Sequence, residues 1–289
     1  MAGAGGRAVG QRRIGPRRIL AIVALAAIGI VYLFPLYWIL ATSLKSKAEV
    51  FGSEPTLIPN APTLAAFGDV LFERDFIRLL LNSVIVCGAA MVLSIILGLA
   101  IAYPLTRLVV SRRLRANVLN WALSLRFLPP IAVVVPYFGI IRFIGLYDEP
   151  LALILVYTLF NLPFALWMLK GFLVEIPMEV EEAAFVDGAS RWQAFRQVLL
   201  PLATPGLLAS GIIIFAFAWS EFLFALILTA TPQAQTFPVG VKGLVTQFEI
   251  IWNEMAAAGV IAIVIPLTLM LLARRYVIAG LTFGVIREK

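Results

Sequence analysis

The chain has 289 residues, of which 62% are hydrophobic and 13% are charged, and its formal net charge is +7. Soluble domains are about 45–50% apolar and about 25% charged, so this composition excludes an ordinary water-soluble protein. The chain has no histidine and one cysteine, which excludes an intrachain disulfide, imidazole acid–base catalysis and His-rich metal sites. We therefore expect an all-α polytopic membrane protein that is not an enzyme and binds no metal ion.

Two further absences narrow the possible functions. The basic residues lie in short clusters between apolar segments, which is typical of membrane topology signals and not of nucleic-acid binding. The sequence also lacks the Gly-x-x-x-x-Gly-Lys-Ser/Thr phosphate loop. We predict that this chain binds no cofactor, so any ATP would be bound by another polypeptide.

Apolar runs of about 20 residues are long enough to cross the hydrocarbon core of a bilayer as helices. The first run is longer than the apolar core of a secretory signal, so we interpret it as a retained span. The spans form one predicted membrane domain at 19–276, between a basic N-terminal tail at 1–18 and a C-terminal tail at 277–289. The six predicted transmembrane helices are residues 19–41, 79–103, 118–140, 151–169, 206–229 and 256–276.

The connections between these spans differ in their content of lysine and arginine. If the N-terminus is cytoplasmic, sixteen of these residues fall on the cytoplasmic side and six on the other side. Short translocated loops contain few lysine and arginine residues, so both termini are predicted to be cytoplasmic.

The longest predicted cytoplasmic connection, residues 175–201, contains signals for two short helices. Pro177 followed by several glutamates is typical of a helix N-terminus, and Gly188 is expected to end this first helix. Ser190 and Gln193 have capping-box spacing, which predicts that a second helix begins there.

The second predicted helix of this connection is amphipathic. Trp192, Phe195 and Leu199 share one face of it, and Pro201 is expected to mark its end. A helix pair lying on the lipid surface is the alternative interpretation, but its acidic polar face argues against that, because such helices favour lysine and arginine. We therefore expect an element that docks another protein.

This connection resembles the EAA loop of type I ABC import permeases. The resemblance is carried by Glu182-Ala183-Ala184, then Gly188, then Val198-Leu199-Leu200-Pro201. The family usually has isoleucine where Val198 stands. In that family the loop is a coupling helix that fits a groove of the ATPase subunit. The resemblance implies that the ATPase-coupling residues are Glu182, Ala183, Ala184, Asp187, Gly188, Trp192, Phe195 and Pro201.

Other segments resemble the carbohydrate branch of this family, in particular its permease subunits with six spans of the maltose-importer type. Ser220 departs from the usual asparagine, and the last residues of the chain diverge from the family's C-terminal tail. The matching segments are residues 42–45, 145–148, 161–164, 219–222 and 280–284.

The resemblance implies a six-helix, MetI-like permease fold in the inner or cell membrane of a bacterium or archaeon. It also implies three kinds of protein partner: a second, similar permease subunit, two ATPase subunits that hold ATP and Mg, and an extracellular or periplasmic solute-binding protein. The chain itself would be the non-catalytic transmembrane subunit, in contact with membrane lipid.

Glu221 is the only acidic residue well inside a predicted span, where a charge costs at least about 2.5 kcal/mol unless it faces protein or water. It either faces the translocation path or forms a hydrogen bond to another helix. We assign Glu221, Trp219, Ser220 and Asn161 to the translocation path. The helical rise puts Arg126 about 10 Å away in depth, which predicts that Arg126 does not pair with Glu221 and extends to the interface.

Together these features predict the permease subunit of an ATP-driven, binding-protein-dependent importer for sugars or related polyols. The alternative is a stand-alone secondary transporter or channel, which would be expected to show internal repeats and several intramembrane charges. A membrane-embedded enzyme would need clustered catalytic or metal-binding residues, which the sequence lacks.

Overall fold

A computed structural model describes residues 16–246 and 249–282, and in these ranges nearly all regular structure is helical. One isolated antiparallel bridge joins Val245 to Ile250. Five helices are long and apolar enough to cross a membrane, or six if one bent pair counts as a single span. The longest helices are α1 (Pro16–Ser43), α4 (Phe76–Arg107), α7 (Pro150–Glu175), α10 (Leu200–Trp219) and α13 (Trp252–Thr282).

Four of the six predicted spans are confirmed, since the runs at 19–41, 79–103, 151–169 and 256–276 lie inside α1, α4, α7 and α13. These helices extend a few residues beyond the apolar runs at both ends. The described part of the C-terminal segment continues α13 to Thr282, and residues 1–15 and 283–289 of the two predicted tails lie outside the described residues.

The third predicted span, 118–140, is not one continuous helix. The structure has two helices there, α5 (Arg112–Arg126) and α6 (Pro130–Phe143), whose axes differ by 97° across a short break. The break precedes Pro129 and Pro130, because a residue before proline disfavours the α conformation and proline has no N–H to continue the ladder.

The fifth span was also predicted wrongly as one helix at 206–229. In the structure α10 ends at Trp219, and a separate helix α11 (Leu223–Leu228) follows after three residues. At its other end α10 continues directly from α9 (Arg191–Ala194) and the π-helical turn η2 (Phe195–Leu199). Pro201 therefore does not end a helix as predicted. It is the second residue of α10, directly after the π-helical turn η2, so its missing N–H falls where the regular helical ladder is already irregular.

The core is built around the contact between α4 and α7. Gly98 of α4 lies directly against Ala165 of α7, and a Cβ atom at Gly98 would lie 2.9 Å from that of Ala165. Buried leucines of α7, including Leu169, surround this contact. The helix α10 packs against both α4 and α7, and Gly206 makes room for the ring of Phe172. Small residues thus allow three membrane helices to approach closely.

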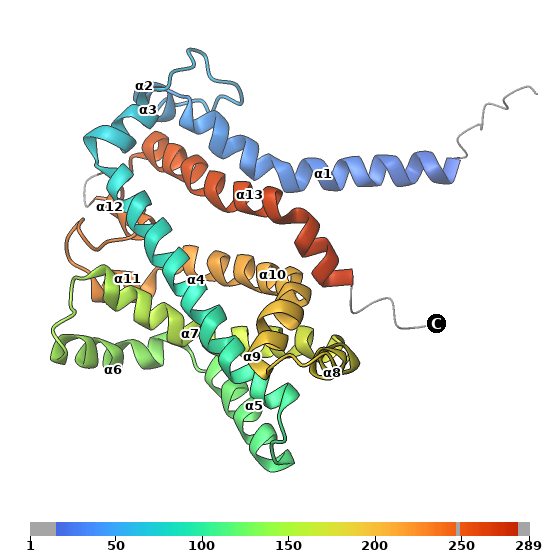
Figure 1. Cartoon of the computed structure of the whole chain (residues 1–289). Coiled ribbons are helices and arrows are strands. Elements are labelled where there is room, and N and C mark those ends of the chain that lie inside the picture. The colour runs from blue at the N-terminus through green and yellow to red at the C-terminus, as the bar shows by residue number, and fades with distance from the viewer. Residues whose placement is uncertain (1–15, 247–248, 283–289) are drawn as a thin grey trace, which may run out of the picture.

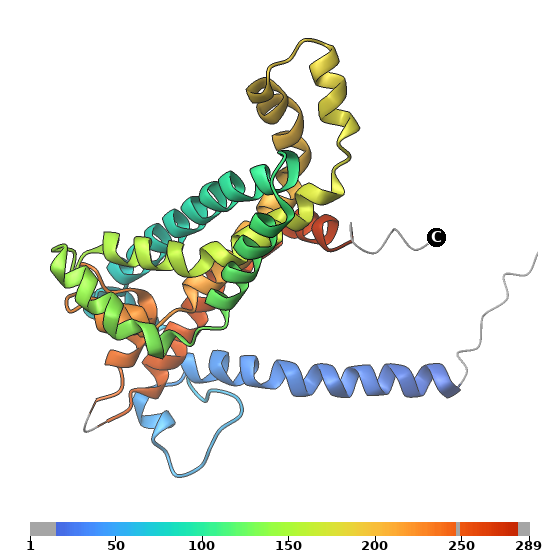
Figure 2. The same cartoon turned by 90° about the horizontal axis from the view of Figure 1, so that it is seen from below.

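The first helix is the least packed of the long helices. From Leu20 to Leu40 no side chain of α1 is buried. Figures 1 and 2 show that α1 extends away from the other helices and meets α13 only near its own C-terminal end, where Ile39 approaches Gly259. Most of its apolar surface is therefore available to lipid or to another protein.

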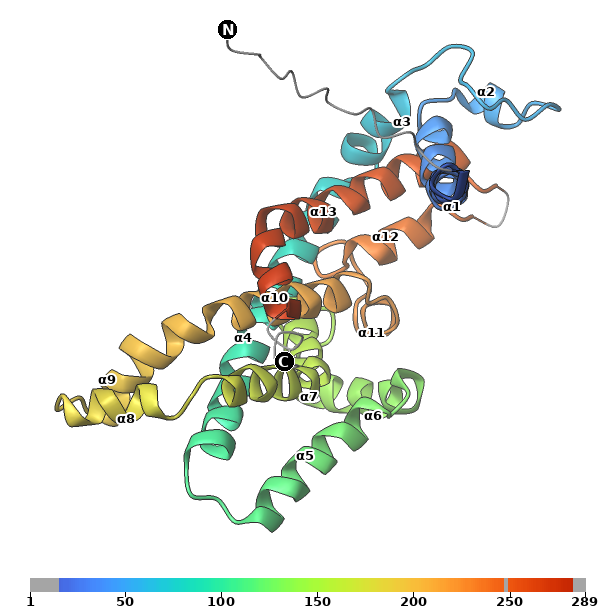
Figure 3. The ribbon, with the colours of Figure 1, turned by 90° about the vertical axis from the view of Figure 1, so that its right-hand side faces the viewer.

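The short helices gather at two ends of the molecule. One end carries α2 (Lys47–Val50), α3 (Ala65–Gly68), the π-helical turn η1 (Asp69–Glu73) and α12 (Phe237–Gly243). The helix α8 (Glu179–Val186) and α9 lie together on the side of the molecule away from α2 and α3 (Figure 3).

Candidate coupling and translocation sites

The connection 175–201 forms a helix–turn–helix that projects from the packed helices (Figure 2). The first helix, α8, begins at Glu179, two residues later than Pro177 suggested. Three of its glutamates lie in the first turn, where the helix dipole favours negative charge. The connection is therefore an ordered element, as predicted, and not an extended linker.

A glycine turn separates the two halves of this element. Gly188 has φ +86°, a left-handed conformation that residues with a Cβ rarely adopt, and its N–H donates to the carbonyl of Phe185. Ala189 donates to the carbonyl of Ala184, so the last carbonyls of α8 are satisfied in the manner of a glycine C-cap. The prediction that Gly188 ends the first helix is confirmed.

The predicted capping box of the second half is also confirmed. The Ser190 hydroxyl accepts from the Gln193 N–H at 3.3 Å, and the Gln193 side chain accepts from the Ser190 N–H at 2.7 Å. Both bonds satisfy donors that the first turn of a helix cannot satisfy internally. The local sequence therefore determines where α9 begins.

The outer surface of α8 and its turn is solvent-accessible. Glu182, Ala183, Asp187 and Gly188 are exposed, and Ala184 is half-buried. The exposed apolar residues Phe185 and Val186 accompany them, with Val186 at 87% exposure. A surface that combines carboxylates, small residues and exposed apolar side chains is suited to contact another protein.

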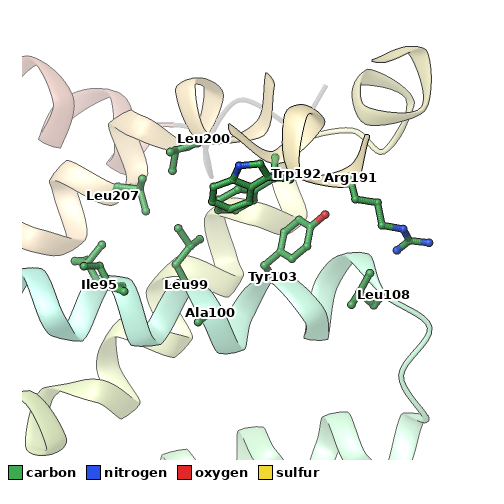
Figure 4. A pocket seen from close by; sticks show the side chains of 11 residues that line it. Ile95, Leu99, Ala100, Tyr103, Leu108, Arg191, Trp192, Leu200 and Leu207 are labelled. Carbon is green, nitrogen blue, oxygen red and sulfur yellow. The ribbon is translucent and has the colours of Figure 1, made fainter. Parts of the chain in front are cut away.

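Trp192 and Phe195 lie where the second half of the connection meets α4. Trp192 stacks on Phe195 with ring centroids 5.5 Å apart, and Phe195 meets the edge of Tyr103 at 5.1 Å. Figure 4 shows Trp192 and Tyr103 facing a groove of about 660 Å³ between α4 and the start of α10, with Arg191 and Leu108 at one end. The predicted apolar stripe continues to Leu199, which is fully buried.

A contact that the sequence reasoning missed joins α4 to α8. Arg107 is the last residue of α4, and its Nε atom meets the Glu181 carboxylate in an ion pair. Nothing in the local pattern signalled this contact, because the two residues are far apart in the sequence. The neighbouring Glu182, which the family resemblance highlighted, points to solvent instead.

A second site is a small cavity where the two broken spans meet α7. Its volume is about 170 Å³, and it combines charged, polar and aromatic side chains. Two of the four residues predicted for the translocation path, Asn161 and Glu221, line it. The lining residues are Arg126, Tyr157, Phe160, Asn161, Phe217, Glu221 and Phe224.

The Glu221 carboxylate lies in the break between α10 and α11 and not inside a continuous helix. It accepts hydrogen bonds from the backbone N–H groups of Phe224 at 2.9 Å and Ala225 at 3.3 Å. These are otherwise unsatisfied donors at the N-terminus of α11, where the helix dipole also stabilises negative charge. This arrangement lowers the cost of placing a carboxylate within the membrane segment.

Asn161 is 4% exposed, and its amide donates to the Tyr157 carbonyl one turn earlier on α7. Its Oδ1 atom is buried without a hydrogen-bond partner among the described residues. A buried acceptor without a partner is costly, so it is suited to accept a hydrogen bond from a group that enters the cavity.

Arg126 forms no ion pair with Glu221 among the described residues. Its guanidinium lines the same cavity as Glu221, a position that the sequence did not predict, 4.7 Å from the ring centroid of Phe217 and 5.6 Å from that of Phe164. Depth counted along one span does not give the distance between the two side chains, because α5 and α10 each end at a break beside this cavity. Cation–π contacts of this kind stabilise a cation that has left bulk water.

Trp219 and Ser220, the other two residues assigned to the translocation path, do not line this cavity. The Trp219 indole donates to the Ala262 carbonyl of α13 at 3.1 Å and its ring stacks on Phe215. The Ser220 hydroxyl donates to the Ala216 carbonyl of its own helix. Trp219 therefore joins two helices, and Ser220 helps to end α10.

The described residues contain no cluster of three or more cysteine, aspartate or glutamate side chains that could hold a metal ion. The sites are therefore defined by a projecting helix pair and by a mixed polar and aromatic cavity among broken helices. Both belong to an all-helical membrane protein of the transporter class, and comparison with known proteins gives the family.

The fold is similar to that of solved ABC importers. A bacterial ABC transporter involved in the import of the acidic polysaccharide alginate aligns with a TM-score of 0.77 at 21% identity, covering 89% of this chain and 95% of the other. The MetNI methionine transporter aligns with a TM-score of 0.52 at 22% identity, covering 70% of this chain and 96% of the other.

Curated relatives match along nearly their whole length. The trehalose transport system permease protein SugB of Mycobacterium tuberculosis is 38% identical over 95% of this chain and 100% of that protein. The sulfoquinovosyl glycerol transport system permease protein SmoH of Agrobacterium fabrum is 36% identical over 93% of each. The trehalose/maltose transport system permease protein MalG of Thermococcus litoralis is 32% identical over 94% of this chain and 96% of that protein.

The sequence model of the binding-protein-dependent transport system inner membrane component family matches residues 90–282. This chain belongs to that family, and it is a multi-pass inner membrane permease of the ABC importer type. The predicted family and fold class are thereby confirmed.

Proposed function

We propose that this chain is the permease subunit of an ATP-driven, binding-protein-dependent importer for sugars or related polyols. The observation that supports this most directly is the exposed α8–α9 element on a permease fold, in a chain whose relatives are named as sugar transport permeases. The chain lacks a nucleotide-binding loop, so it serves as the non-catalytic subunit of the complex.

The coupling step takes place at α8. Its exposed carboxylate Glu182 and the apolar residues Phe185 and Val186 fit a groove on an ATPase subunit, and two such subunits bind ATP and Mg. The turn at Gly188 sets the angle between the two halves of the element. Because α9 continues into α10 without a break, a displacement of the docked element reaches the membrane helices directly.

The position of the helix ends supports a cytoplasmic location for both termini. In Figure 1 the start of α1 and the end of α13 lie toward the right-hand side, as α8 does, whereas α2 and α3 lie at the left. This agrees with the greater number of lysine and arginine residues on that side. The opposite end, with α2, α3 and α12, then faces the solute-binding protein.

A second permease subunit completes the translocation path. The extensive exposed apolar surface of α1 supports a partner helix bundle as well as lipid at this position. Within this chain the solute route passes the cavity that holds Arg126, Asn161 and Glu221. Sugar hydroxyls suit the Asn161 Oδ1 acceptor, and sugar C–H faces suit the aromatic walls.

The test is uptake by proteoliposomes that contain the complete complex and its solute-binding protein. We expect uptake of a labelled sugar or polyol only with ATP, and none when the ATPase partner carries a hydrolysis-dead substitution. Uptake that continues on an ion gradient without ATP hydrolysis would instead support a secondary transporter. Binding of a sugar and polyol panel to the isolated solute-binding protein identifies the substrate.

A further inference from the structure

The contact between Arg107 and Glu181 is deeply buried although both residues are charged. Each side chain is only 5% exposed, and the pair joins the C-terminal end of α4 to the first turns of α8. Burying an ion pair is expensive, because the desolvation of both charges offsets much of their attraction. Such a pair therefore contributes little net stability. Its main effect is expected on the relative position of α4 and α8.

Arg107 holds more than one point of the connection. One terminal nitrogen donates to the carbonyl of Ile176 at 2.8 Å, and the other contacts the sulfur of Met178 at 3.4 Å. Together with Glu181, these contacts fix the segment that leads from the end of α7 into α8. A guanidinium is suited to this role, since its planar donors hold several partners in fixed directions.

A second contact of α4 reaches the other half of the connection. Tyr103 lies one helical turn before Arg107, so both side chains project from the same face of α4. Tyr103 packs edge-on against Phe195 in η2, at a centroid distance of 5.1 Å. One face of α4 therefore contacts both halves of the coupling element.

The backbone of α4 is weakened at this same position. Pro104 lies inside the helix and has no N–H to donate, so one bond of the helical ladder is missing in the turn that leads to Arg107. Because this bond is missing, side-chain contacts determine whether the last turn of α4 moves together with the coupling element. Earlier in the same helix, the close packing of Gly98 against Ala165 connects α4 to α7.

We propose that Arg107 is a positioning residue which, through Glu181 and the Ile176 carbonyl, makes α4 move as one body with the coupling element. Displacement of α8 by the ATPase then reaches the α4–α7 core through this side chain as well as through the covalent chain. This inference rests on the proposed importer function, because it assumes that α8 is the element that the ATPase moves.

The first experiment exchanges the two charges in the complete reconstituted complex. Arg107→Glu and Glu181→Arg are each expected to reduce solute uptake per ATP hydrolysed by at least about fivefold, since a lost coupling of 1–3 kcal/mol corresponds to 5–150-fold. The double variant is expected to regain part of that ratio, because it restores the ion pair but not the donor to the Ile176 carbonyl. The control is Arg113→Glu, the same charge change at an exposed position in α5, which should keep the wild-type ratio.

The outcomes separate this inference from the proposed function. A wild-type complex without ATP-dependent uptake contradicts the proposed function. If the wild-type complex transports, two results contradict the role of Arg107. The single variants could keep the wild-type ratio of uptake to hydrolysis, or the double variant could regain none of the lost ratio. A purely structural role would lower the amount of assembled complex and leave this ratio unchanged.

The second experiment leaves the ion pair intact, so it remains informative if the charge variants do not assemble. Spin labels are placed at the exposed positions Leu97 in α4 and Val180 in α8 after Cys87→Ser removes the single native cysteine. We expect the distance between the labels to be the same without nucleotide and with ATP trapped in the ATPase subunits. A change of more than about 5 Å, nearly one helical turn, would show that α4 and α8 move independently.

Discussion

The coupling element and the cavity differ in how their geometry arises from the sequence. In the coupling element the helix ends are fixed by neighbours within five residues, as at Ser190 and Gln193. In the cavity Arg126 and Glu221 come from different broken helices and meet only in the folded chain. Local capping signals therefore define a docking element, whereas interrupted helices bring distant polar groups together inside the membrane. The predictions below test this contrast, from the largest expected effect to the smallest.

Replacing Glu221 should have the largest effect on stability, because its carboxylate accepts hydrogen bonds from two backbone N–H groups at the start of α11. We expect Glu221→Ala to lower the free energy of unfolding in detergent by about 2–3 kcal/mol, as two buried donors lose a charged acceptor. Sugar uptake by the reconstituted complex should fall at the same time. Glu221→Gln keeps one oxygen acceptor and should lose less. If both variants assembled and transported like the wild type, this result would contradict both a structural role and a transport role of Glu221.

Replacing Gly188 tests the turn of the coupling element. We expect Gly188→Ala to cost about 1–2 kcal/mol, because a Cβ disfavours the left-handed backbone even though no atom lies within 4 Å of it. ATP-dependent uptake should fall with it, as the angle between α8 and α9 changes. Gly171→Ala is the matched control, since this glycine of α7 also has free space but no positive φ. Equal uptake by the two variants would show that the turn geometry does not matter.

Removing the N-cap of α9 should have a smaller effect. Ser190→Ala deletes one bond of the capping box, and we expect a loss of about 1 kcal/mol in the free energy of unfolding. Ser190→Asp should restore most of it, because aspartate is an equally good N-cap. Thermal unfolding of the purified complex measures both. A loss that aspartate does not reverse would contradict the capping role.

The smallest expected effect concerns Asp148, outside the membrane helices. Burial raises its pKa, but the N–H groups of Ala230 and Thr231 and the Thr231 hydroxyl outweigh this, so the pKa lies below its usual value. The stabilisation is therefore complete above the usual aspartate pKa of about 3.9 and is lost as the pH falls through the lowered pKa.

Accordingly, Asp148→Asn should be less stable than the wild type by about 0.5 kcal/mol at neutral pH, and this difference should vanish under strongly acidic conditions. Melting temperatures across a pH series measure it. Asp75→Asn is the control. Asp75 has a positive φ, as Asp148 does, but its carboxylate makes no capping hydrogen bond to the helix that follows it. A difference that persists at low pH would mean that the charged hydrogen bonds are not its cause.

The sequence-based predictions succeeded where the interacting residues are close together in the sequence. Apolar length identified four spans, and capping residues located the turn and the start of α9. The bounds of the other two spans came from apolar length, which does not show where a helix breaks. Pro129 and Pro130 favour a kink, and Glu221 is a carboxylate within an apolar run, but neither signal tells a kink in a continuous helix from a complete break.

Other features depend on tertiary packing and could not be predicted from one sequence. The pairing of Arg107 with Glu181 requires α4 and α8 to lie side by side. The shared cavity requires the 97° turn that brings Arg126 toward α7 and α10. Trp219 was assigned to the translocation path from its position in a motif, whereas its indole in fact joins α10 to α13.

The helix from Arg191 to Trp219 runs without interruption for 29 residues, or roughly 40 Å at the helical rise. It has no loop along this length in which a displacement could be absorbed. A tilt of about 5° around its midpoint would move each end by about 2 Å in opposite directions. Its far end lies next to Glu221, so a small rotation at the membrane surface is sufficient to reshape the polar cavity at the opposite end of this helix.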